Sequence, residues 1–240
     1  TLKFLCVVGT PKGNQVVGFT CSGGGATMLA DHAEKIDLTF PEFKSTQQTE
    51  LSALLPDIAT VSNPLDYTTP IWGHAEMTYP VFAKAISAIE ADTAVLVQDY
   101  PAAEIDSSKV YYRADAMAFA RASKEQGLPA IICATLPENM DLETRHLLIE
   151  KGVAPMQGIH EALNAIRDSA DWNQARSRIL SEKPEYLLPS YPSSEQKVMS
   201  ESDSKRWLKN NNFNVPNGKT VSPHKLGEAA SEVGYPVALK

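Results

Sequence analysis

The residues that could do chemistry gather in one short run near the start of the chain, TCSGGGATM at positions 20–28. Three consecutive glycines, Gly23 to Gly25, separate an apolar strand pattern from a helical pattern, and glycine lets the backbone approach a ligand closely. The first N–H groups of such a helix point outward, where the positive end of the helix dipole attracts a phosphate or a carboxylate. The run therefore predicts an anion site over Ser22 to Ala26. A tight turn without any ligand explains the same glycines, and that alternative stays open.

The kind of anion is constrained by what the run lacks. No lysine stands where a Walker motif requires one, since Thr27 and Met28 occupy that region, and a G-x-G-x-x-G dinucleotide fingerprint is also missing. A flavin phosphate would use several hydroxyls at such a turn, and Ser22 and Thr27 are those available. The turn thus predicts an anion without specifying which one.

Asn63 and Asp66, in the run NPLD at positions 63–66, are the other candidate site residues. The proline biases Asn63 toward an extended backbone. Both side chains can bond nearby backbone in a local turn, or they can line a site at the carboxyl end of a strand, and both interpretations stay open here. No group of His, Cys and Asp residues has metal-ligand spacing, so we expect no metal ligand in this chain.

The hydrophobic pattern predicts the fold that positions these candidate residues. Strand patterns alternate with helix patterns about five times, and runs such as TAVLVQ at 93–98 are typical of parallel strands covered on both faces. We therefore predict an α/β fold, a doubly wound parallel sheet, with the glycine turn at the carboxyl end of its first strand. The expected strands cover 15–21, 36–43, 58–62, 93–98, 129–135 and 153–156, and the expected helices cover 26–35, 46–55, 75–90, 107–126, 142–151 and 159–180.

The composition changes near Ser181. Residues 181–197 carry several prolines and serines without a helical period, which is typical of an extended linker. Beyond it we expect a helix at 200–211, a strand at 215–221, a helix at 223–233 and a strand starting at 237. These ~40 residues are too few to bury a core of their own, so we expect them to lean on further sequence. The predicted organisation is a domain at 1–180, a linker at 181–197 and a truncated domain at 198–240, in a piece cut from a longer protein.

The bulk composition narrows the class of protein. A formal net charge of -7 and a pI near 5.3 argue against nucleic-acid binding, which needs a basic surface. No apolar run approaches the ~18–20 residues that span a bilayer, and the start lacks the pattern of a signal peptide. Cys6, Cys21 and Cys133 are too widely spaced for a disulfide framework, so we expect a reducing compartment, the cytoplasm.

The motifs, taken in order, resemble those of NDP-forming (ADP-forming) acyl-CoA synthetases of the succinyl-CoA synthetase superfamily. In that family a strand ends in a Ser-Gly-Gly turn before an Ala-Asp-rich helix, matched at 20–33, and an Asn-Pro-x-Asp signature follows, matched at 63–66. The runs GVAP at 152–155 and EAL at 161–163 resemble the family's closing strand and helix. Residues 200–240, with FNVP at 213–216 and GYPVALK at the end, resemble the beginning of a fused ATP-grasp domain.

The resemblance implies a flavodoxin-like domain inside a ligase that makes acyl-CoA from a carboxylic acid, CoA and ATP and releases ADP and phosphate. In such enzymes a helix N-terminus like this one docks a phosphoryl group carried by a histidine of another domain. The family's Ser-His-Thr-Gly motif is absent here, so we expect no catalytic histidine in this piece. Asn63 and Asp66 would lie beside the site, and Lys240 would contact ATP. The implied phosphate-binding residues are Ser22, Gly23, Gly24, Gly25 and Ala26.

The resemblance also implies ATP or ADP, CoA and Mg²⁺ in the full-length enzyme, none of them bound by this piece alone. The implied partners are the CoA-binding and phosphohistidine domains of the same protein, the rest of the ATP-grasp domain and a small carboxylic acid, with no nucleic acid and no membrane. The identity of the acid and a homo-oligomeric state stay open. Two other functions stay open as well: a catalytically silent, ligand-sensing module fused to an enzyme such as a protein acetyltransferase, and a free-standing flavodoxin-like carrier.

Overall fold

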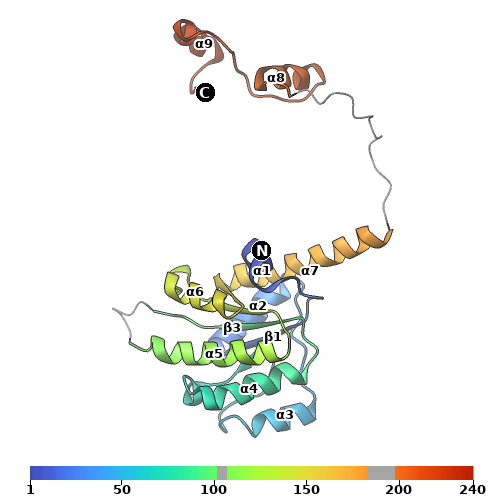
Figure 1. The fold of residues 1–240 in the computed structure, drawn as a ribbon, viewed down its shortest axis with the longest axis vertical. Helices are drawn as coiled ribbons and strands as arrows, with labels where there is room; N and C mark the ends of the chain where they lie inside the picture. The colour runs from blue at the N-terminus through green and yellow to red at the C-terminus, as the bar shows by residue number, and fades with distance from the viewer. Residues whose placement is uncertain (102–106, 183–197, 240) are drawn as a thin grey trace. The chain divides into compact units, whose positions relative to one another are not determined.

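The chain forms a parallel sheet covered by helices on both faces, followed by a second, smaller helical unit (Figure 1). The computed structural model describes residues 1–101, 107–182 and 198–239. The chain divides into Thr1–Pro184 and Glu185–Lys240. None of the helices in the described part of the chain is long and apolar enough to cross a membrane.

The sheet has five parallel strands in the order β2-β1-β3-β4-β5. This is the flavodoxin-like order, and it confirms the predicted doubly wound sheet. The direction of winding reverses between β1 and β3, so the crevice at their carboxyl ends is the expected place for a ligand. The strands are β1 (Val16–Thr20), β2 (Leu65–Asp66), β3 (Thr93–Val97), β4 (Ala130–Ala134) and β5 (Val153–Gln157).

Helices bury the two faces of the sheet in separate cores. One face is covered by α1 (Leu2–Val8), α2 (Gly23–Glu34) and α7 (Ile159–Glu182). The other is covered by α3 (Ser45–Ser52), α4 (Ala75–Ala88), α5 (Lys109–Glu125) and α6 (Leu142–Glu150). Two short 3₁₀ turns, η1 (Thr69–Ile71) and η2 (Pro137–Asn139), lie in the connections.

Strand alternation decides which residue enters which core. Successive side chains of a strand point to opposite faces, so β1 sends Val16 into the core under α2 and Phe19 into the core under α4. Phe19 packs edge-on against Phe82 and Phe119, with ring centroids 5.0 and 5.8 Å apart. Because both faces are covered, every residue of β1, β3 and β4 is buried, which explains the continuous apolar runs.

Two of the expected strands are wrong. Within 36–43 only Thr39 pairs with the sheet, in an isolated bridge to Gln15. Residues 58–62 form no strand, and Ile58 is 73% exposed. A strand needs a free edge to pair with, and the outer edge of β1 is covered first by Thr39 and then by β2.

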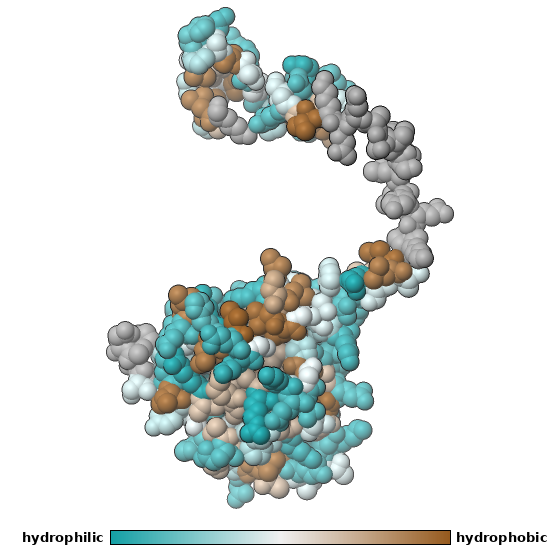
Figure 2. All heavy atoms as spheres, in the orientation of Figure 1, coloured by the Kyte–Doolittle hydropathy of each residue, from teal (hydrophilic) through white to brown (hydrophobic). Residues whose placement is uncertain are grey.

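The second unit contains α8 (Glu201–Asn210), η3 (Pro223–Lys225) and α9 (Leu226–Val233). The strands expected at 215–221 and from 237 are not formed within residues 198–239, because no partner strand is present there. Trp207 and Phe213 are more than half exposed, and Figure 2 shows brown, apolar residues on this unit. The first two residues of the predicted linker belong to α7, which ends at Glu182, and the rest of that linker lies outside the described residues.

Candidate functional site

The glycine turn lies at the carboxyl end of β1, next to the point between β1 and β3 where the direction of winding reverses. Helix α2 begins at Gly23, earlier than the predicted start at residue 26, because Ser22 acts as the N-cap. Ser22 has an extended backbone, φ -148° and ψ 140°, and its Oγ accepts a hydrogen bond from the Gly25 N–H at 3.2 Å. Such a cap satisfies one of the N–H groups that a helix start leaves without an intrahelical partner. The glycines therefore form the first turn of the helix.

The cap leaves two N–H groups available at this helix start. The Gly25 N–H is bonded to Ser22 Oγ, and the Ala26 N–H is bonded to the Ser22 carbonyl oxygen, both at 3.2 Å. The N–H groups of Gly23 and Gly24 have no acceptor among the residues that the structure describes, and both residues are exposed. Of the residues predicted to bind phosphate, these two present N–H groups to an incoming anion.

The three glycines have different surroundings. A Cβ atom on Gly25 would lie 2.4 Å from Thr20 Oγ1, so the close approach of helix to strand requires glycine there. A Cβ atom on Gly23 would lie 3.7 Å from Asp66 Oδ2, an ordinary contact distance. A Cβ atom on Gly24 would meet nothing within 4 Å. Packing thus accounts for Gly25, whereas the space in front of Gly24 is open to a ligand.

Asp66 places a carboxylate beside the glycine turn. It ends β2 directly opposite Thr20 of β1, and its Oδ2 is the atom that faces Gly23. Its Oδ1 accepts a hydrogen bond from the Thr68 N–H at 2.9 Å. Thr68 has φ 68°, in the left-handed region that β-branched residues rarely adopt. A sharp bend after β2 therefore holds Asp66 against the start of α2.

Asn63 lies at the middle of β1 instead of at the turn. Its Oδ1 accepts a hydrogen bond from the Gly18 N–H at 2.9 Å, and its Nδ2 donates to the carbonyl oxygens of Val16 and Pro41 at 2.9 and 3.0 Å. β2 pairs with β1 only from Phe19 onward, so the Asn63 amide takes the place of a strand backbone along the first half of β1. Asn63 is thus not among the residues that the structure brings to the glycine turn, and it forms no local turn either.

Among the described residues, neither a thiol nor a histidine provides a nucleophile at the turn. Burial, followed by the negative charges of Asp115 and Asp66, raises the pKa of the Cys21 thiol to about 11. At neutral pH this thiol is protonated, and the protonated form is a poor nucleophile. His32 lies near the far end of α2, with its ring centroid 5.6 Å from that of His160 on α7.

A buried polar network next to the bend is the feature that the sequence pattern did not predict. Asp115 of α5 accepts hydrogen bonds from the Tyr67 hydroxyl and the Thr78 hydroxyl, both at 3.0 Å, and from the Gly73 N–H at 3.1 Å. Burial raises the pKa of Asp115, while these three donors oppose the rise. An acidic residue on an amphipathic helix is normally placed at the surface, so the position of Asp115 on the buried face of α5 was the available signal.

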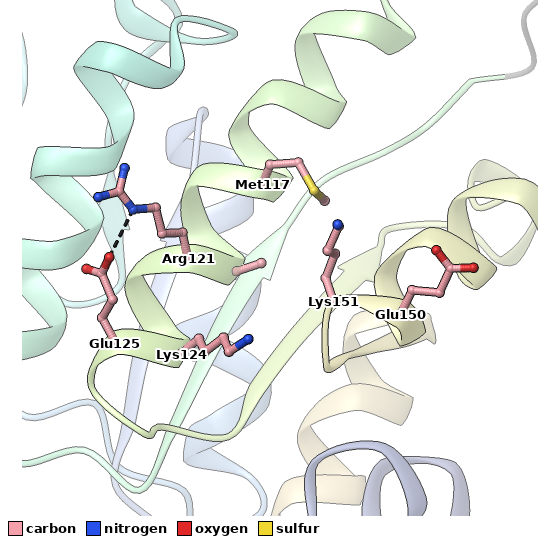
Figure 3. A pocket seen from close by; sticks show the side chains of 7 residues that line it. Met117, Arg121, Lys124, Glu125, Glu150 and Lys151 are labelled. Atoms are coloured by element: carbon pink, nitrogen blue, oxygen red, sulfur yellow. Dashed lines mark hydrogen bonds and ion pairs between the residues drawn. The ribbon is translucent and has the colours of Figure 1, made fainter.

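A groove of about 770 Å³ lies between α5 and α6 (Figure 3). Glu125 and Lys151 stand where these helices lead into β4 and β5, so the groove faces the amino ends of the strands. The glycine turn lies at the carboxyl ends, and the groove is therefore separate from it. The lining residues are Met117, Ala120, Arg121, Lys124, Glu125, Glu150 and Lys151.

The residues proposed for metal and nucleotide binding differ in whether the structure describes them. Within the described ranges, no three His, Cys, Asp or Glu side chains come close enough together to hold a metal ion. Lys240, which the resemblance places on ATP, lies outside the described residues, so its contact with ATP stays a prediction.

Comparison with known proteins identifies relatives of the fold. No family model and no curated protein matches the sequence. The chain is similar to PH0766 from Pyrococcus horikoshii OT3, with a TM-score of 0.57 and 20% identity over 72% of this chain and 40% of that one. It is also similar to the dinucleotide forming acetyl-coenzyme A synthetase 1 of Ca. Korarchaeum cryptofilum in complex with phosphate and ADP, with a TM-score of 0.57 and 18% identity over 77% of this chain and 38% of that one. The chain spans 38–40% of the length of these proteins, and at such identities the similarity shows a shared fold.

Proposed function

We propose that this chain is part of an NDP-forming acyl-CoA synthetase, which makes acyl-CoA from a carboxylic acid, CoA and ATP and releases ADP and phosphate. Two findings support the proposal: the order of the sequence motifs along the chain, and the similarity of the fold to an acetyl-coenzyme A synthetase. The chain spans 38% of that synthetase, so other domains would carry the remaining steps.

The observation that carries the proposal is the arrangement at the start of α2. The Gly23 and Gly24 N–H groups have no acceptor in the described part of the chain, and the space in front of Gly24 is open. Helix α2 has 12 residues, so its dipole adds a positive field at this end. Preorganised N–H groups of this kind stabilise a transferring phosphoryl group without reorganising. The role of this domain is therefore to dock a phosphoryl group that a histidine of another domain delivers.

The negative charge of Asp66 weakens anion binding at the same site. Its carboxylate stands beside Gly23, where its negative charge opposes a phosphoryl anion held by the two N–H groups. The opposing charge lowers the affinity of the empty enzyme for free phosphate, so that the phosphoryl group is held briefly and passed on.

In the full-length enzyme the partners are the CoA-binding and phosphohistidine domains, the rest of the ATP-grasp domain and a small carboxylic acid. ATP with Mg²⁺ supplies the phosphoryl group when bound, and Lys240 would contact it.

The test is CoA-dependent ADP release by the full-length protein with Gly24→Val. The valine side chain would enter the open space before the turn, so we expect the fold to persist while ADP release falls about a hundredfold, the size of effect seen when oriented donors are lost. Met28→Val puts the same side chain on the exposed face of the same helix, where Met28 is 41% exposed, and should retain activity. Unchanged turnover in Gly24→Val would contradict the docking role. Wild-type protein that binds CoA but releases no ADP with any acid would favour the ligand-sensing alternative.

A further inference from the structure

The bend that carries Asp66 to the glycine turn is strained. Thr68 has a left-handed φ of 68°, its side chain is 8% exposed, and within the described ranges its hydroxyl has no hydrogen-bond partner. A β-branched residue with this backbone and a buried, unpaired hydroxyl is unfavourable by itself. Such a conformation persists only where the surrounding structure over-determines it. Some other contact must therefore hold this segment in place.

Asp115 makes that contact. It is completely buried, and its Oδ2 accepts a hydrogen bond from the Tyr67 hydroxyl at 3.0 Å. The Gly73 N–H lies 3.1 Å from each of its two oxygens. Tyr67 directly precedes the strained Thr68 and Gly73 follows it, so one carboxylate fixes the chain on both sides of the bend. Tyr67 is also tied to β1, since its N–H donates to the Thr20 carbonyl oxygen at 2.9 Å.

Burying a carboxylate in a core costs more free energy than burying an apolar side chain. Among the described residues no Lys or Arg forms an ion pair with Asp115, and its donors are two hydroxyls and one backbone N–H. Apolar side chains of similar volume often stabilise a core as well as buried charges do. Asp115 differs from an apolar side chain because its hydrogen bonds are directional: its oxygens accept them only from donors placed correctly around them. The bonds from Tyr67 and Gly73 to Asp115 therefore fix where the segment after β2 lies, whereas the bond from Thr78 comes from α4.

We propose that Asp115 is a positioning residue that acts through the Tyr67 hydroxyl to hold the Asp66 carboxylate beside Gly23, where its charge prevents the docked phosphoryl group from being held too tightly to be passed on. This inference rests on the function proposed for the glycine turn. Asp115 itself touches no reacting group, and its effect is transmitted along the backbone from Tyr67 to Asp66.

A matched pair of variants in the full-length protein tests the proposal. Tyr67→Phe and Thr78→Val each remove one fully buried hydroxyl that donates to Asp115 at 3.0 Å, so their effects on stability should be similar. Tyr67 adjoins Asp66, whereas Thr78 lies on α4. We expect Tyr67→Phe to lower the kcat of CoA-dependent ADP release about tenfold to a hundredfold with KM for ATP unchanged, since a displacement on the order of 1 Å has effects of this size. We expect Thr78→Val to keep the wild-type kcat.

Three outcomes would overturn the inference while the proposed function stands. Equal losses of kcat in both variants would indicate a general weakening of the core, and no loss in Tyr67→Phe would show that the hydroxyl positions nothing. Additive losses in the double variant Tyr67→Phe/Asp115→Asn would also contradict it, because two changes along one path should together cost no more than the larger single change. Wild-type protein without ADP release would refute the proposed function and this inference with it, so the two failures can be told apart.

Discussion

Replacing Gly25 by alanine tests how closely α2 packs against β1. The new Cβ would lie 2.4 Å from Thr20 Oγ1 and 3.1 Å from Thr20 Cβ, and Thr20 is 3% exposed. Overpacking of this kind costs about 1–3 kcal/mol, and loss of the hydrogen bond from the Ser22 N–H to Thr20 Oγ1 costs about 1 kcal/mol more. Alanine normally gains ~0.5–1 kcal/mol over glycine in a helix. We therefore expect the free energy of unfolding to fall by about 2 kcal/mol.

Gly24→Ala is the matched control, because its Cβ would meet nothing within 4 Å. It should raise the free energy of unfolding by ~0.5–1 kcal/mol, so urea denaturation followed by circular dichroism should separate the two variants by about 3 kcal/mol. Thr20→Ala, added to Gly25→Ala, should recover part of the loss because the clashing hydroxyl is gone. Equal stabilities of Gly24→Ala and Gly25→Ala would refute the close approach of helix and strand.

Two further predictions concern residues away from the turn. Asn63→Ala leaves the Gly18 N–H unpaired at the sheet edge and should lower the free energy of unfolding by about 2–3 kcal/mol in urea, so a change near zero would contradict the bridging role of Asn63. Burial alone would raise the pKa of Asp141, but hydrogen bonds from Lys109 and Thr144 lower it from 3.8 to about 2, so its contribution to stability is present above pH 3.8 and is lost as the pH falls toward 2. Because Asp141 is 34% exposed, we expect Asp141→Asn to cost only about 1 kcal/mol at neutral pH and a small fraction of that near pH 2 in thermal unfolding; a cost that does not change with pH would contradict this.

Much of the fold could be predicted because the buried strands have a distinctive pattern. β3 and β4 are covered on both faces, so their sequences are continuously apolar and short, and the helices between them show their own period. β2 could not be predicted because it has only two residues, Leu65–Asp66, and its place depends on the free edge of β1. The run at 58–62 has the sequence pattern of a strand, but the outer edge of β1 that it would join is already paired with Thr39 and β2.

The site was predictable only where it is local in sequence. The glycine turn follows from adjacent residues, yet the choice of Ser22 as N-cap decides which N–H groups are free, and that choice depends on how α2 meets Thr20. The network around Asp115 joins Tyr67 and Thr78 to a helix that lies tens of residues later in the chain. A sequence pattern with periods of two or 3.6 residues contains no information about such contacts.

The proposed synthetase activity is tested by identifying the nucleotide that the full-length protein releases when given ATP, CoA and a panel of carboxylic acids. We expect ADP together with an equal amount of the matching acyl-CoA. Release of AMP would contradict it, because AMP indicates a synthetase that activates the acid as an adenylate. The absence of any nucleotide turnover, despite binding of CoA or ATP, would contradict it as well.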